Sequence, residues 1–325
     1  VLIVYWLAAL LFSPLREVIQ LFCGLWGLVT LPGLVLNRLV GNERLRGLAP
    51  AVMSGLLVNM CGVHALFVLS TLTGLSVPLA AVLWAIDTAV VLPVPVIGKN
   101  LLLLDTDTLN SLGRIGLIAI VVGVGLRLAL ALSSGGAIAP DASLFADYAR
   151  AVVQGKFVSG VMNDFAVVSV AGQTQFVAHQ GFAYLFAVGW ILVPPSQSGP
   201  VVILLLIGSI LPVLAFSVAR EFLGMEAGRW TAVIVAVHPL FVFHSAIAYG
   251  PELSSLAFIL MAVLLLVDGD EHHIRSLVLA GFLLGVVDII WYSNFYVIMA
   301  VIALASAFVW RRQPKRVLSL LLLLG

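Results

Sequence analysis

Long apolar runs separated by short polar turns make up most of the chain. A bilayer core takes roughly 20 apolar residues per helix, and several runs approach that length. They lie near 18–37, 50–72, 77–97, 115–133, 200–219, 229–247, 251–267, 276–291 and 293–310, with partial runs at 1–12 and 317–325. This pattern predicts an all-α polytopic membrane protein.

Composition supports this prediction. Of the 325 residues, 62% are hydrophobic and 10% are charged, whereas a soluble domain has about 25% charged residues. No Lys- or Arg-rich run suggests nucleic acid as a partner. Cys23 and Cys61 lie in apolar runs, so neither a disulfide framework nor a CxxC metal site is expected. The chain starts without Met and ends inside "VLSLLLLLG", so we expect it to be a piece of a longer protein.

The basic residues predict the orientation, because cytoplasmic loops are enriched in Lys and Arg. If the runs alternate across the membrane, 12 of the 16 basic residues fall on one side. These are Arg38, Arg44, Arg46, Lys99, Arg114, Arg220, Arg229, Arg275, Arg311, Arg312, Lys315 and Arg316. Arg127 lies within a span. The segment 134–199 is then one large extracytoplasmic loop.

This alternation requires that "GFAYLFAVGWILVP" (181–194) does not cross the membrane. Its 14 residues are too few to span comfortably. We predict a juxtamembrane or re-entrant helix at the membrane interface, with Tyr184 and Trp190 as interfacial anchors.

Three regions follow from this topology. Residues 1–98 form N-terminal transmembrane helices, 99–113 a cytoplasmic connector, and 114–325 a membrane module that contains the external loop.

The most polar segment of the external loop is "PDASLFADYARAVVQGKF" (140–157). Read as a helix from Asp141, it places Asp141, Phe145, Tyr148 and Val152 along one stripe. Gly155 would end the helix as a C′ residue. The segment therefore predicts an amphipathic helix outside the membrane.

The spacing Asp141, Phe145 and Ala149, followed by a Gly, resembles the first external loop of the GT-C glycosyltransferase superfamily. The protein O-mannosyltransferase and aminoarabinose transferase families belong to it. "FVAHQGFAY" (176–184) is similar to the family's His-Pro-Pro-x-x-Tyr, with Gln180 and Gly181 in place of the prolines. The external acidic residue of the later helices would be Glu252. Trp291 stands where the family commonly has an Arg.

The resemblance implies transfer of a sugar from a polyprenyl- or dolichyl-phosphate donor at the outer face of the cell membrane. The acceptor would be a protein, a lipid or a glycan. Asp141 is the expected general base and Glu252 a second carboxylate. Cationic groups or a divalent metal ion would offset the charge on the departing phosphate. The expected substrate-binding residues are His179, Tyr148, Arg150, Lys156, Tyr249 and Asp288.

Structural interpretations compete with several of these roles. Asp141 is also consistent with a helix N-cap, and Asp147 with Arg150 is consistent with a solvated ion pair. His179 fits an interfacial histidine as well as a substrate or metal contact.

Other polar residues lie in or near apolar runs. His238 is expected in the packed core, and His244 is a weaker site candidate. Asp87, with Asn59 and His64, is expected to form a buried polar contact between helices. "DTD" at 105–107 imitates a metal motif of soluble transferases but falls on the cytoplasmic side.

Two other classes remain open. A transporter or channel would also combine many helices with a few buried carboxylates, and it predicts repeats or paired broken helices. A non-catalytic GT-C homologue is the other alternative.

Overall fold

The computed structural model confirms an all-α membrane protein. It describes Val4 and residues 13–91, 106–154, 168–170, 173–175, 180–193, 198–248, 250–267, 273–290 and 294–312. The described strands, β1 (Val168–Val170) and β2 (Gln173–Gln175), form a small antiparallel sheet. All other described elements are helical.

The N-terminal group contains α2 (Ser13–Gly24), the π-helical η2 (Leu25–Thr30), α3 (Leu31–Val40), the short η3 (Glu43–Leu45), α4 (Leu48–Thr73) and α5 (Leu79–Val91). Pro32 has no N–H to donate to the Leu28 carbonyl, which lies four residues earlier. The side-chain amide of Asn59 on α4 donates to that oxygen instead. A Cβ at Gly55 would lie 1.6 Å from the Val29 carbonyl oxygen, so α4 packs closely against η2.

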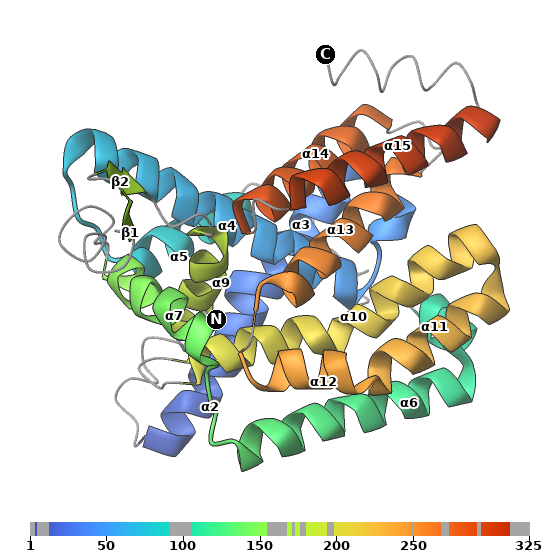
Figure 1. Cartoon of the computed structure of the whole chain (residues 1–325), viewed down its shortest axis with the longest axis horizontal. Helices are drawn as coiled ribbons and strands as arrows, with labels where there is room; N and C mark the ends of the chain where they lie inside the picture. Colours follow the sequence, from blue (N-terminus) through green and yellow to red (C-terminus); the bar gives the residue numbers. More distant parts are fainter. Residues whose placement is uncertain are drawn as a thin grey trace.

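The remainder contains the longer helices. They are α6 (Thr106–Ser133), α7 (Pro140–Val153), α9 (Gln180–Leu192), α10 (Gly199–Leu223), α11 (Met225–Val237), α12 (Pro239–Ala246), α13 (Glu252–Leu266), α14 (His273–Ile290) and α15 (Phe295–Arg312). In Figure 1, α6, α10 and the α11–α12 pair form one layer, while α13, α14 and α15 lie above it. The backbone of α6 breaks at Gly113 (φ 69°, ψ 174°).

Fewer helices reach spanning length than the apolar runs predict. Among the described residues, Arg16–Val40, Leu48–Ser70, Asn110–Ser133 and Gly199–Leu223 are long and apolar enough to cross a membrane. The pair α11 and α12, bent by 50°, would add a fifth span. The prediction of a full span at 251–267 is wrong in length, because α13 has 15 residues.

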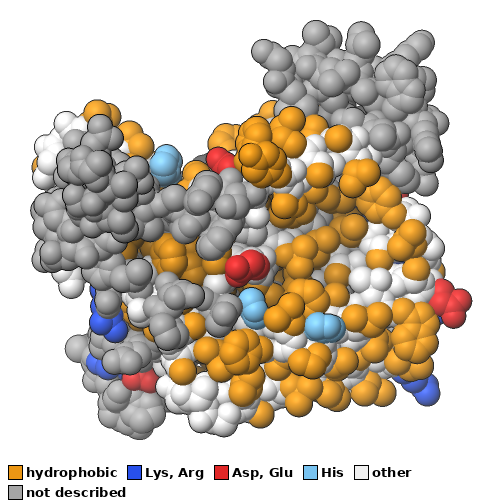
Figure 2. Space-filling model, viewed as in Figure 1, with side chains coloured by type: hydrophobic (Ala, Val, Ile, Leu, Met, Phe, Trp, Pro, Cys, Tyr) orange, Lys and Arg blue, Asp and Glu red, His pale blue; other side chains and the backbone are white. Residues whose placement is uncertain are grey.

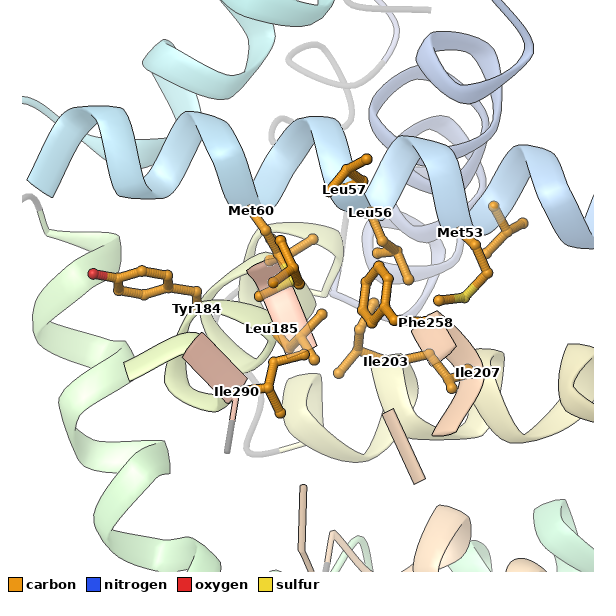
Figure 3. Packing of buried hydrophobic residues seen from close by; sticks show 14 of the residues in the cluster. Met53, Leu56, Leu57, Met60, Tyr184, Leu185, Ile203, Ile207, Phe258 and Ile290 are labelled. Carbon is orange, nitrogen blue, oxygen red and sulfur yellow. The ribbon is translucent and has the colours of Figure 1, made fainter. Parts of the chain in front are cut away.

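The helix α9 lies inside the protein. All its described side chains are buried, with Tyr184 1% and Trp190 6% exposed. The prediction that these two residues anchor the helix at the lipid interface is therefore wrong. Figure 3 shows Leu185 of α9 within an apolar cluster that also contains Met60 of α4 and Ile203 of α10. At 13 residues, α9 is too short to count as a span.

Several predicted cytoplasmic turns meet at one end of the molecule. The Arg44 guanidinium lies 3.2 Å from Glu221 at the end of α10. Arg275 on α14 donates to the Leu39 carbonyl at 2.9 Å. Arg229 on α11 donates to the Ser111 carbonyl at 2.7 Å. The structure thus brings the basic turns together, as the alternating topology predicts.

Away from the basic end, much of the molecular surface is apolar. Figure 2 shows a face on which hydrophobic side chains dominate and charged ones are isolated. On α6, Ile115, Val121 and Leu132 are exposed. We interpret this face as the one that contacts lipid tails.

Candidate active site

The first turn of α7 and the segment before α13 lie side by side. The Ala139 N–H donates to the Ala248 carbonyl at 3.0 Å, and Ile138 pairs with Ala248 in a parallel β-bridge. Ala139 precedes Asp141 by two residues, and Ala248 precedes Glu252 by four. The fold therefore brings the segments that carry the two predicted catalytic carboxylates together at one site.

Asp141 is not the N-cap of its helix. The N-cap is Ala139, Pro140 occupies the first turn, and α7 begins at Pro140. The N-cap alternative for Asp141 is therefore wrong, as is the predicted helix start at Asp141. Its side chain lies outside the described part of the structure. A carboxylate in the first turn still interacts favourably with the helix dipole.

Glu252 occupies the first turn of α13 and faces solvent. Its side chain is 59% exposed, and one carboxylate oxygen lies 3.9 Å from His244 Nδ1. A Cβ at Gly250 would lie 2.2 Å from Glu252 Oε2, so the carboxylate folds back over the start of its own helix. His244, at the end of α12, thus places a basic side chain beside this carboxylate.

The end of α14 forms another side of the site. Asn294 donates to Ser255 Oγ at 2.9 Å and to the Val287 carbonyl at 3.3 Å, which joins α13 to this end. A Cβ at Gly181 would lie 2.8 Å from the Ile290 nitrogen, so α9 begins against the same end. Asp288 lies on this last turn with an exposed side chain.

Tyr148 and Arg150 lie further along α7, against α9. Phe145 and Phe182 stack edge to face at 5.4 Å between ring centroids. Arg150 lies 5.1 Å from the centre of the Trp190 ring. Nine residues separate it from Asp141, roughly 13 Å along the axis. The predicted stripe is confirmed for Tyr148 and Val152, which are buried.

The phenol of Tyr148 is buried without a hydrogen-bond partner among the described residues. Burial raises the pKa of Tyr148 to about 12. Burial also raises the pKa of Tyr184, and the neighbouring Tyr148 adds to that rise. Both phenols therefore stay protonated at neutral pH.

Sequence reasoning gave Arg127 no role, and the structure assigns it one. Its side chain is 1% exposed, and it donates to the carbonyls of Ala236 (2.6 Å) and Val235 (3.3 Å). It also donates to Ser245 Oγ at 3.0 Å. Pro239 frees the Val235 carbonyl because it has no N–H. In the sequence, only an arginine within one apolar run and a proline within a later one could have indicated this contact.

His238 is exposed, so the expectation of a core histidine is wrong. Its Nδ1 accepts from the Leu240 N–H at 3.2 Å and caps α12. In an unbroken helix the Leu240 N–H would instead donate to the Ala236 carbonyl. The Ala236 carbonyl is thereby left for Arg127.

The predicted contact among Asp87, Asn59 and His64 does not form. Asn59 bonds to the carbonyls of Leu28 and Gly55. Asp87 is buried, and its carboxylate oxygens have no hydrogen-bond partner among the described residues.

Some predicted site residues lie outside the described structure. They are His179, Lys156, Tyr249 and the side chain of Asp141. The side chain of Asp147, from the expected ion pair with Arg150, also lies outside it. Among the described residues, no group of three or more His, Cys, Asp or Glu could hold a metal ion. The divalent metal ion stays a prediction.

Among the comparisons with known proteins, one family model matches part of the chain. No curated protein matches the chain, and no solved structure matches it. A family match covers residues 181–325, from the first turn of α9 onward, and does not include α7. The matching family model is that of the dolichyl-phosphate-mannose-protein mannosyltransferases, which supports a glycosyltransferase of the GT-C type.

Proposed function

We propose that the protein transfers one sugar from a polyprenyl- or dolichyl-phosphate donor to an acceptor hydroxyl at the outer membrane face. Mannose is the sugar and a protein is the acceptor that the matching family favours. The observation that carries the proposal is the Ala139–Ala248 hydrogen bond. It joins the segment just before Asp141 to the segment just before Glu252, and the second of these lies within the residues that the family model matches.

The reaction needs a base more than an acid. The acceptor oxygen attacks the anomeric carbon and forms the new glycosidic bond. The bond from that carbon to the phosphate oxygen breaks, and its electron pair leaves with the lipid phosphate. Asp141 takes the proton of the acceptor hydroxyl, so the products are the glycoside and the lipid phosphate.

The surroundings of Asp141 and Glu252 suit an anionic leaving group. The first turns of α7 and α13 lie at the positive ends of the two helix dipoles, which favour negative charge. His244, 3.9 Å from Glu252, would add a positive charge when protonated. Glu252 then orients the donor or an ion at the phosphate, while Asp141 serves the acceptor.

The test is transfer of labelled sugar from dolichyl phosphate mannose by the full chain in membranes. Asp141→Asn should lower the rate by about 10²–10⁴ because it removes the base. Glu252→Gln should cause a smaller loss. The matched control is Asp107→Asn on the first turn of α6, at the opposite end of the molecule, and it should keep full activity.

Stability distinguishes a catalytic role for Asp141 from a structural one. Since Ala139 is the N-cap, Asp141→Asn should leave the thermal unfolding midpoint nearly unchanged. A variant with unimpaired transfer at equal membrane abundance would exclude Asp141 as the base. Inactivity of the wild type with every lipid-phosphate sugar would instead favour a non-catalytic homologue.

A transporter shares one feature with this structure, the bent pair α11 and α12. In transporters the carbonyls at such breaks coordinate ions. Here the Val235 and Ala236 carbonyls bind Arg127, so the break is already filled by a cation of the protein itself. Solute counterflow in proteoliposomes without sugar transfer would support the transporter.

A further inference from the structure

His64 of α4 belongs to the N-terminal helices, to which the sequence assigns no role in the site. Its ring centroid lies 6.3 Å from that of Tyr184 on α9. Its Nδ1 is buried without a hydrogen-bond partner among the described residues. An N-terminal helix thus places a histidine with an unpaired ring nitrogen beside the helix at which the family match begins.

Tyr148 presents a second unpaired atom to the same region. Its side chain is 7% exposed, and its hydroxyl has no partner in the described part of the chain. In Figure 3 the Tyr184 side chain points away from the apolar cluster, with its hydroxyl toward α7, the helix that carries Tyr148. The three side chains therefore come from α4, α7 and α9 and converge.

The turn between α4 and α5 contacts the end of α7. Ser76 in that turn donates to the Gln154 carbonyl at the end of α7 at 3.3 Å. The N-terminal helices thus contact α7 at its last turn as well as α9. An unpaired buried hydroxyl or imidazole destabilises the folded protein, and a bound ligand with complementary groups would remove that penalty.

We propose that His64 and Tyr148, on either side of Tyr184, bind hydroxyl groups of the donor's sugar, so that the N-terminal helices complete the substrate site. The proposal rests on the proposed function, since it names a part of that donor. A phenol both donates and accepts hydrogen bonds, and a neutral imidazole nitrogen does one or the other. These properties match sugar hydroxyls. Neither side chain is a fixed cation, so the chemistry suits a neutral sugar better than a phosphate.

The test compares two probes on the purified full chain in lipid nanodiscs: dolichyl phosphate mannose and dolichyl phosphate without sugar. Tyr148→Phe removes only the unpaired hydroxyl. It should weaken binding of the sugar-bearing lipid by about three- to tenfold, the effect of one hydrogen bond. Binding of the lipid phosphate should not change. The thermal unfolding midpoint should stay the same or rise.

His64→Phe is the second variant, because it keeps a ring against Tyr184 while removing the nitrogens. It should show the same selective loss. Tyr296→Phe is the matched control, since Tyr296 is 79% exposed on α15, and it should bind both lipids normally.

Equal affinities of both variants and the wild type for the sugar-bearing lipid would overturn the inference and leave the proposed function intact. An equal loss for both lipids would assign the site to the phosphate and also overturn it. A wild type that binds neither lipid would refute the proposed donor, and the inference with it.

Discussion

At the scale of single residues, two buried side chains take over carbonyls that prolines leave free. Asn59 donates to the Leu28 carbonyl, four residues before Pro32. Arg127 donates to the Val235 carbonyl, four residues before Pro239. Membrane helices tolerate proline where a neighbouring group satisfies the freed oxygen. Asn59 therefore stabilises irregular backbone in the N-terminal helices, and Arg127 does so in the membrane module.

Arg127→Met should destabilise the protein by about 2–4 kcal/mol, because it leaves the Val235 and Ala236 carbonyls buried and unpaired. Thermal unfolding in detergent measures the change. The matched control is Arg229→Met, which removes an exposed arginine that also donates to a backbone carbonyl. It should cost less than about 1 kcal/mol. Equal effects of the two substitutions would contradict the bonding described for Arg127.

At the scale of helices, close packing depends on a few glycines. A Cβ at Gly123 of α6 would lie 2.3 Å from the Ala236 carbonyl oxygen. Two residues later, a Cβ at Gly125 meets nothing within 4 Å. The contact at Gly123 brings α6 close enough for Arg127, one turn further on, to reach the broken helix.

Gly123→Ala should destabilise the protein by about 1–3 kcal/mol, since α6 must move away from α11. Gly125→Ala should be neutral or stabilising by up to about 1 kcal/mol, because alanine favours the helix. Thermal unfolding of the two variants, which differ only in position along one helix, provides the comparison. A milder effect at Gly123 than at Gly125 would be inconsistent with this packing.

At the scale of the whole molecule, the two ends differ in charge and in chemistry. One end carries Arg44, Arg229 and Arg275 in hydrogen-bonded turns. The other carries the starts of α7 and α13. The positive-inside rule therefore predicts that the basic end is cytoplasmic and that the candidate site faces outward.

Cysteine labelling of intact cells tests this orientation. Cys23 and Cys61 are free, so both are first replaced by alanine. Ser159→Cys, in the predicted external loop, should then react with a membrane-impermeant reagent. Ser111→Cys, at the basic end, should react only after permeabilisation. The reverse pattern would place the candidate site on the wrong side for an extracytoplasmic donor.

The sequence by itself determined the helical membrane class, the gathering of basic turns and the helical segment that carries Asp141. Each of these depends on local composition and spacing, which a single sequence displays directly. The position of α9 in the protein interior could not be predicted in this way. Its 13 apolar residues fit a membrane interface as well as a protein interior, and only packing by α4, α7, α10 and α14 buries it.

Tertiary structure alone decided which distant groups meet. The Ala139–Ala248 bond joins backbone atoms, which leave no mark in side-chain patterns. The partners of Arg127 lie more than 100 residues away, on a helix whose break frees them. His64 is polar in an apolar run, but its place beside Tyr184 follows from how α4 crosses α9. The long-range contacts that assemble the candidate site depend on packing, which local residue patterns do not encode.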